Sequence, residues 1–182
     1  MSVPHELDDS VIVDRCLAGD TDAFELLVDR YHRVLFSVAL RMLGDRDEAA
    51  DATQTAFVKA YERLTGYRAE YRFFSWIYRI LANECLNRLR ARRPQEPLDT
   101  EVPGPGGPVD AFEAAERRRQ VQAAILALTP EYREVIVLRH FADLSYDEIA
   151  QTLGIGAGTV KSRLYSARQQ LCDRLGAWAS SR

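Results

Sequence analysis

The sequence lacks the features of several common classes of protein. Its 182 residues include only three cysteines, Cys16, Cys85 and Cys172, which are widely separated and odd in number. They suggest neither a zinc-ligand pair nor a disulfide framework, so a reduced protein of the cytoplasm is the simplest interpretation. The longest nearly unbroken apolar stretch, residues 34–40, is too short to cross a bilayer. The first ten residues have no basic segment followed by an apolar one, so they are not a signal peptide. We therefore expect no membrane insertion.

Residue patterns typical of catalytic or cofactor sites are also missing. His5, His32 and His140 stand apart from any cluster of carboxylates or cysteines, and no glycine-rich nucleotide-binding loop is present. We therefore expect no catalytic residue, metal, cofactor or small-molecule substrate. A helical enzyme is the least supported alternative.

The net excess of charge of one sign is small overall, but the charged residues are unevenly distributed along the chain. The formal net charge is −3, yet residues 1–30 carry eight acidic residues against two arginines. Residues 79–93 carry five arginines against Glu84, and residues 157–182 carry five cations against Asp173. Because charge acts through local patches, the slightly acidic total does not exclude nucleic acid as a partner.

Proline is scarce except in one stretch. Five of the seven prolines fall within residues 94–108, together with Gly104, Gly106 and Gly107. Such a composition disfavours helices and central strands, so we predict a linker over residues 94–110 between domains 1–93 and 111–182. Fully extended, the linker could reach about 55–60 Å. The two halves could therefore bind separate places on a partner without touching each other.

Both halves are predicted to be helical, because apolar residues recur at spacings of three and four and no segment shows a convincing strand pattern. Gly44 is expected to end the first long helix, Asp47 to cap the next, and Gly66 to close that one. The fold class is therefore all-α, with two small helical domains joined by a Pro/Gly-rich linker. The expected helices cover residues 24–42, 47–64, 72–92, 110–128 and 130–140, followed by a C-terminal pair that begins at Ser145.

Residues 144–164 have the pattern of a helix-turn-helix. Ala150 and Gly154 provide a small residue at the helix crossing and a glycine at the turn. The first helix of this motif is expected to begin with a capping box of Ser145 and Glu148. The alternative is a solvated amphipathic helix after a tight turn. The expected shared core is Ile149, Leu153, Ile155, Val160 and Leu164, and the residues exposed on the second helix are Thr159, Lys161, Ser162, Arg163, Tyr165, Ser166 and Arg168.

Residues 73–93 combine aromatic residues at their start with arginines at their end. Aromatic rings beside cations suit single-stranded nucleic acid, whose unstacked bases need flat partners and whose phosphates need counter-charge. The alternative places Phe73, Trp76, Ile77 and Ile80 in the core and the arginines at a helix C-terminus, where the helix dipole favours them. The composition leaves both interpretations open.

Three motifs, in order and on both sides of the linker, resemble those of the extracytoplasmic-function (ECF) sigma factors. Gly19-Asp20-Thr21-Asp22-Ala23-Phe24 resembles the opening of that family, and residues 48–61 with 73–83 resemble its region 2. Residues 158–164 resemble the recognition helix of its region 4. The resemblance covers nearly everything from Asp8 to Leu175, and it implies that residues 1–93 form region 2 and residues 111–182 form region 4.

The resemblance implies a non-enzymatic factor that binds the clamp coiled coil and the flap of core RNA polymerase. It also implies binding to promoter DNA, both duplex and single-stranded, DNA opening, and control by an anti-sigma factor. Carried over residue by residue, the contacts with polymerase fall on Asp51, Gln54 and Phe57. Those with the −10 element fall on Tyr67, Arg68, Trp76, Arg79, Asn83 and Arg88, and those with the −35 element on Thr159, Lys161, Ser162, Arg163, Tyr165, Ser166 and Arg168.

This chain differs from the usual pattern of the family at two positions, and the sequence also allows one alternative function. Thr55 stands where the family commonly has Glu, and Ser166 stands where many relatives have a cation. The alternative function is a conventional dimeric helix-turn-helix regulator whose N-terminal half is a helical sensor. Such a regulator binds paired half-sites, so tight binding of the free protein to a palindrome would favour it.

Overall fold

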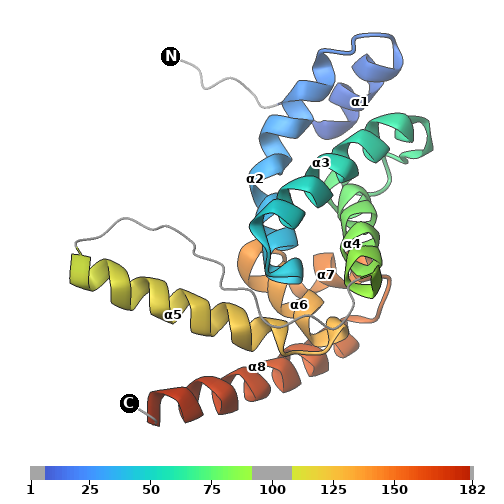
Figure 1. Ribbon diagram of the computed structural model, residues 1–182. Coiled ribbons are helices and arrows are strands. Elements are labelled where there is room, and N and C mark those ends of the chain that lie inside the picture. Colours follow the sequence, from blue (N-terminus) through green and yellow to red (C-terminus); the bar gives the residue numbers. More distant parts are fainter. Residues whose placement is uncertain (1–6, 92–107, 181–182) are drawn as a thin grey trace, which may run out of the picture.

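The computed structural model describes residues 7–91 and 108–180, and of their side chains those of residues 7–91 and 114–176. These residues form eight α-helices and one short 3₁₀ turn, with no strand among them, which confirms the all-α prediction (Figure 1). The elements are α1 (Asp9–Leu17), α2 (Ala23–Leu43), α3 (Arg46–Glu62), η1 (Leu64–Gly66), α4 (Phe73–Ala91), α5 (Pro108–Leu126), α6 (Pro130–Phe141), α7 (Tyr146–Leu153) and α8 (Ala157–Ser180).

Helices α1 to α4 form the N-terminal bundle. On α3, four alanines at spacings of three and four are fully buried between α2 and α4. Small side chains at these positions allow helices to approach closely. The largest fully buried side chains of this half include Ile12, Leu27, Leu35, Phe73, Ile77 and Tyr78. The bundle therefore holds α4 against α2 and α3 along one side, and α7 of the C-terminal half also packs against this helix.

The helix ends differ in part from the sequence-based predictions. Gly44 ends α2 with a φ of 77°, as expected. The predicted cap at Asp47 is wrong, because Asp45 takes that role and accepts a hydrogen bond from the Glu48 N–H at 2.8 Å. Helix α3 also ends before Gly66, because the chain turns into η1. Helix α1 was not expected; Asp8 caps it.

Helices α5 to α8 form the C-terminal half. Helix α5 begins at Pro108, inside the stretch assigned to the linker, and residues 92–107 lie outside the described residues. The capping box of Ser145 and Glu148 is confirmed, with both reciprocal hydrogen bonds present. Gly154 then makes the turn with a φ of 68°.

The core of the helix-turn-helix differs from the prediction at one end of α7. Ile149, Val160 and Leu164 are buried as expected, but Leu153 and Ile155 are only half-buried. Thr152 is buried instead, with 1% of its surface exposed. The reason is that α7 packs against α4 of the other half as well as against its own partner helices.

The two halves are in contact at two places (Figure 1). Helix α4 packs against α7, and α2 packs against both α5 and α6. Arg133 of α6 is 8% exposed and donates hydrogen bonds to the carbonyls of Met42, at 2.8 Å, and of Leu126 and Leu128. A buried guanidinium needs such acceptors, because an unpaired buried charge is costly. The predicted linker would allow the halves to separate, but this structure has them in contact.

Candidate nucleic-acid interface

An aromatic cluster marks the start of α4. The rings of Tyr67, Phe73 and Trp76 have centroids 5.6 Å apart in each pair, and Tyr31 lies 5.7 Å from Phe73. Phe73 is fully buried, whereas Trp76 and Tyr67 are half-buried. Both interpretations of this segment are therefore partly correct. Phe73 belongs to the core, and Trp76 and Tyr67 present part of their rings at its edge.

The loop before α4 is held in shape by its own hydrogen bond. The Tyr67 hydroxyl donates to the Tyr71 carbonyl at 2.7 Å, and Arg68 stands exposed between them. Burial, together with the nearby charges of Asp9 and Asp8, raises the pKa of Tyr67, so the hydroxyl remains a neutral donor.

A cavity of about 770 Å³ adjoins this loop. Tyr67, Tyr71 and Phe74 line one part of it, and Arg30 with Tyr31 lines another. The Arg30 guanidinium is paired there with Asp9, which lines the same hollow. The aromatic walls are the feature that can accept a flat ring such as an unstacked base.

The three polar residues predicted along α4 lie in different environments. Asn83 is exposed, whereas the Arg79 guanidinium donates to backbone carbonyls of α7. The Arg88 Nε donates to Glu84 at 3.1 Å, and its Nη1 lies 3.9 Å from Asp51 on α3. Only Asn83 is therefore fully presented to a partner in this arrangement.

The predicted polymerase contacts lie on the outer side of α3, with one exception. Asp51 and Gln54 are exposed, one turn apart. Phe57 is 6% exposed and packs against the rings of Phe24 and His32, with centroids 6.4 and 6.3 Å away. Phe57 therefore supports this surface from inside, and a partner would meet the carboxylate and the amide first.

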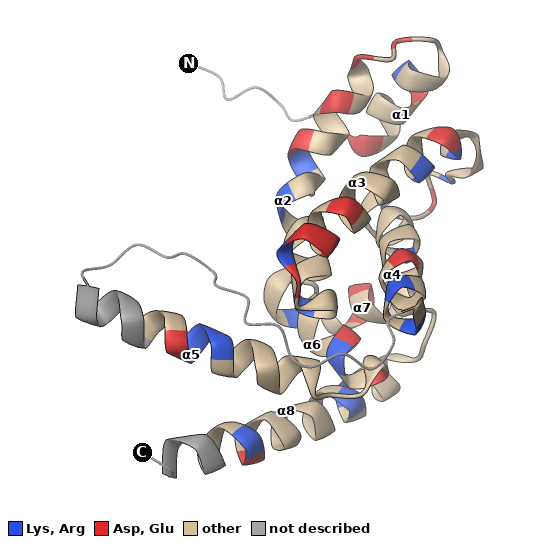
Figure 2. Cartoon of the chain, in the orientation of Figure 1, with Lys and Arg blue, Asp and Glu red and all other residues tan. Residues whose placement is uncertain are grey.

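The residues predicted on the second helix of the helix-turn-helix lie mainly on its outer side. Lys161, Tyr165 and Arg168 are exposed, Tyr165 to 68%. Ser162 is exposed and donates to the Thr159 carbonyl at 3.0 Å. Thr159 is exposed, and Arg163 and Ser166 are half-buried. Figure 2 shows Lys and Arg positions in the first half of α8, so this helix presents donors and positive charge together.

The surroundings of α8 also disfavour protonation of His140 on α6. Burial and the nearby cations Arg168 and Arg139 lower the pKa of His140. Burial is the larger cause of this lowered pKa, and the positive charges of the two arginines add to it.

Two further observations concern the titratable side chains and the helices of the described residues. No group of three or more His, Cys, Asp or Glu side chains there could hold a metal ion. Burial raises the pKa of Cys85 to about 12, which leaves its thiol unreactive at neutral pH. None of the helices in the described part of the chain is both long enough and apolar enough to cross a membrane.

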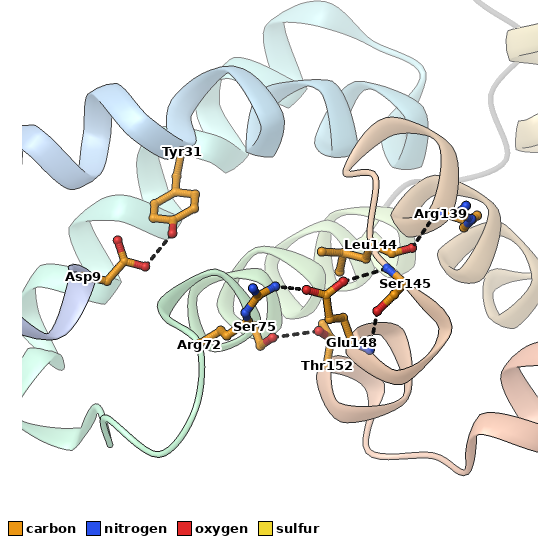
Figure 3. A network of polar contacts seen from close by, with 9 residues as sticks. All are labelled: Asp9, Tyr31, Arg72, Ser75, Arg139, Leu144, Ser145, Glu148 and Thr152. Carbon is orange, nitrogen blue, oxygen red and sulfur yellow. Dashed lines mark hydrogen bonds and ion pairs between the residues drawn. The ribbon is translucent and has the colours of Figure 1, made fainter. Parts of the chain in front are cut away.

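Sequence reasoning missed the residues that join the two halves. Ser75 and Thr152 share a buried hydrogen bond, and Arg72 forms an ion pair with Glu148 (Figure 3). Nothing in the local sequence distinguishes these side chains from ordinary polar residues of a helix. Their role depends on which helices meet, which a pattern along one helix cannot show.

Comparisons with known proteins agree with this arrangement. Two family models match the chain: "Sigma-70 region 2" over residues 27–95, and "Sigma-70, region 4" over residues 118–171. The ECF RNA polymerase sigma factor SigW of Bacillus subtilis is 37% identical over 170 residues, which cover 86% of this chain and 91% of the relative. The ECF RNA polymerase sigma-E factor of Escherichia coli is 35% identical over 183 residues, which cover 93% of this chain and 95% of the relative.

Two solved structures share the fold over most of the chain. CnrH in complex with the cytosolic domain of CnrY superposes with a TM-score of 0.74 at 27% identity, over 93% of this chain and 97% of that one. The sigma factor RpoE in complex with the anti-sigma factor NepR, from Bartonella quintana, gives a TM-score of 0.70 at 24% identity, over 84% of this chain and 96% of that one.

Proposed function

Because this chain belongs to the ECF RNA polymerase sigma factors, we propose that it directs core RNA polymerase to −10 and −35 promoter elements and promotes DNA opening. Sigma factors are transcription initiation factors, so the protein is not an enzyme. One observation carries the proposal. A single chain presents an aromatic-edged loop beside a helix with an exposed Asn in one half, and a helix-turn-helix with exposed cations in the other.

The N-terminal half is assigned to the −10 element. Opening requires a base to leave the stack and be held elsewhere, at a cost of a few kcal/mol. Tyr67 and Trp76 offer partly exposed rings, and Asn83 offers an amide that can both donate and accept. The remaining −10 residues are Arg68, which is exposed, and Arg79 and Arg88, whose charges would meet phosphates.

The C-terminal half is assigned to the −35 element. The second helix of a helix-turn-helix enters the major groove, where its first turns reach base edges. Lys161 and Ser162 are the residues assigned to bases, and both are exposed. Residues near bases or phosphates complete the set: Thr159, Arg163, Tyr165, Ser166 and Arg168.

The outer side of α3 is assigned to the clamp coiled coil of polymerase, and the C-terminal half to the flap. Asp51 and Gln54 can pair with arginines of a partner helix. Val58 and Tyr61 continue the same helix with 52% and 44% exposure, so apolar contact would accompany the polar pairs. Thr55 is half-buried at the position where relatives commonly carry Glu, which removes one charged contact but leaves the surface intact.

An anti-sigma factor is proposed as the second protein partner. The sigma factor RpoE of Bartonella quintana was solved in complex with the anti-sigma factor NepR. The resemblance of this chain to the family implies control by a partner of the same kind. The same α3 surface is the part of this chain that such an inhibitor would need to cover. The site of action would be the cytoplasm, where polymerase and chromosomal DNA are found.

The deciding experiment is transcription from a double-stranded, fragmented bacterial genome by this protein with core RNA polymerase. We expect promoter-specific transcripts from the mixture and none from either component alone. Failure of the protein to bind core polymerase would contradict the proposal. Tight binding of the free protein to a palindromic duplex would favour the dimeric regulator instead.

A further inference from the structure

A cavity of about 320 Å³ is lined by residues of α4, α6, α7 and α8. Its volume falls at the lower end of the range of small-molecule sites, which is about 300–1,000 Å³. The apolar part of the lining includes Leu86 of α4, Leu153 of α7 and Ile155 of the turn that follows. The cavity is therefore large enough for a small molecule and offers it apolar contact.

Polar side chains from both halves of the chain converge on this cavity. Tyr78 and Asn83 line it from α4, Glu134 from α6 and Arg163 from α8. Within the described part of the chain, none of these four side chains makes a hydrogen bond. A few convergent polar groups in a partly apolar hollow are typical of a ligand site.

Tyr78 provides the strongest single observation. It is 1% exposed, and among the described residues its hydroxyl oxygen has no hydrogen-bond partner. Burial, together with the nearby charge of Glu134, raises the pKa of Tyr78 well above its ordinary value, so the hydroxyl is a neutral donor. Since an unpaired buried hydroxyl is unfavourable, this group requires a partner that the neighbouring side chains do not supply.

The second arginine at the cavity is already engaged. Arg79 donates from Nη2 to the Gln151 carbonyl at 2.8 Å and from Nε to the Thr152 carbonyl at 3.0 Å. The last carbonyls of a helix lack partners within the helix and carry a partial negative charge, so Arg79 caps the C-terminal end of α7. Arg163 is therefore the cation at this cavity that a ligand can engage.

The two remaining charged side chains decide which chemistry the cavity accepts. Burial raises the pKa of Glu134, and the charge of Arg163 opposes this, so the carboxyl and the guanidinium lie within electrostatic reach of each other. A pure anion would be repelled by Glu134 and a pure cation by Arg163. A small zwitterion satisfies both.

We propose that this cavity is a binding site for a free α-amino acid with an apolar side chain. The ligand carboxylate pairs with Arg163 and accepts a hydrogen bond from the Tyr78 hydroxyl. Its ammonium group pairs with Glu134, and its hydrocarbon chain contacts Leu153. The ligand is bound and not converted.

A consequence for transcription rests on the proposed function. Asn83 is assigned to the −10 element and Arg163 to the −35 element, and both line this cavity. Neither side chain can contact the ligand and promoter DNA at once. A bound amino acid therefore competes with promoter DNA, by binding one state of the chain in preference to the other.

Isothermal titration of the full chain with L-leucine tests the site. Two matched probes each lack one charge: isocaproate has no ammonium group, and isoamylamine has no carboxylate. We expect each of them to bind about tenfold more weakly than L-leucine or worse, because each leaves one charged side chain unpaired. Equal binding of the three probes, or no binding of L-leucine, L-isoleucine, L-methionine and L-phenylalanine, would overturn the inference.

Two substitutions then locate the bound amino acid. Tyr78→Phe and Glu134→Gln each remove one ligand contact, and each should weaken L-leucine binding about tenfold. Without ligand, Tyr78→Phe should be at least as stable as wild type in thermal unfolding, because the lost hydroxyl has no partner among the neighbouring side chains. Wild-type affinity in both variants would overturn the site, and so would a less stable ligand-free Tyr78→Phe protein.

The matched control is Glu131→Gln. It removes an exposed carboxylate one turn earlier on α6, which also lies within reach of the charge of Arg163 but does not line the cavity. Its affinity for L-leucine should stay within about twofold of wild type. A loss equal to that of Glu134→Gln would show that general charge, and not a contact in the cavity, governs binding.

Transcription with core polymerase separates this inference from the proposed function. L-leucine at about ten times its Kd, added before the polymerase, should reduce promoter-specific transcripts about threefold or more. The same addition should have no effect on Glu134→Gln, and undiminished wild-type transcription would overturn the competition. If the wild-type chain gave no transcripts even without L-leucine, the proposed function would fail, while the titrations would still decide on the site.

Discussion

Lys59 of α3 donates a hydrogen bond to Glu84 of α4, with 2.6 Å between the Nζ and Oε2 atoms. The other carboxylate oxygen accepts from Arg88 at 3.1 Å. Glu84 is the one acidic residue in the strongly basic 79–93 segment, and its side chain is 13% exposed. It therefore joins α3 to α4 and also orients an arginine assigned to DNA.

This relationship predicts a pH-dependent loss of stability in Glu84→Gln. The Lys59 hydrogen bond, with that of Arg88, lowers the pKa of Glu84 below its ordinary 4.5 in the folded protein. The carboxylate thus stabilises the fold above that pH, and this contribution is lost as the pH falls through the lowered value. Urea unfolding should show a deficit of about 1 kcal/mol at pH 7 that shrinks below about pH 4.

The matched control is Glu62→Gln, which removes an equal charge at the exposed end of α3. It should change the free energy of unfolding by less than about 0.5 kcal/mol at either pH. An equal deficit for Glu84→Gln at neutral and acidic pH would show that the ion pair is not its origin.

Two substitutions on α3 should separate stability from polymerase binding. Phe57→Ala removes a ring packed between Phe24 and His32 and should cost about 3–5 kcal/mol of unfolding free energy. Gln54→Ala, at an exposed position, should leave stability within about 0.5 kcal/mol of wild type but weaken binding to core polymerase. Thermal unfolding and polymerase pull-down would measure the two effects. A fully stable Phe57→Ala protein would contradict the buried placement of this ring.

Asn83→Ala should slow promoter opening without weakening polymerase binding. Loss of one base-directed hydrogen bond is expected to reduce open-complex formation about tenfold on duplex templates. A template already melted at the −10 element should restore the rate. Asn87→Ala, one turn further along the exposed side of α4, is the matched control and should behave as wild type. Equal effects of the two substitutions would argue against a specific role for Asn83.

Lys161→Ala should relax specificity at a single −35 position. If Lys161 contacts a base edge, its loss costs about 1–3 kcal/mol at that position and little elsewhere. Arg174→Ala removes the same charge further along α8 and should not alter base preference. Transcription from a set of single-base −35 variants is the measurement. A uniform loss across all of them would make Lys161 a phosphate contact.

Local features of the fold were predictable where the signal lies within a few neighbouring residues. Gly44 and the Ser145–Glu148 capping box were expected from residue type and spacing, and both occur. The choice of Asp47 over Asp45 as a cap failed, because both residues are good caps and only the path of the incoming chain selects one.

The order of motifs along the chain was sufficient to determine the family and the helical class. Those properties depend on periodicity, capping and turn residues, which are local and therefore visible in sequence. Only the tertiary structure decided that Phe57 is buried, that Thr152 replaces Leu153 in the core, and that Arg79 caps α7. Each of these follows from which helices meet. The contact of Arg79 with α7, for example, joins residues more than seventy positions apart and leaves no mark on either segment alone.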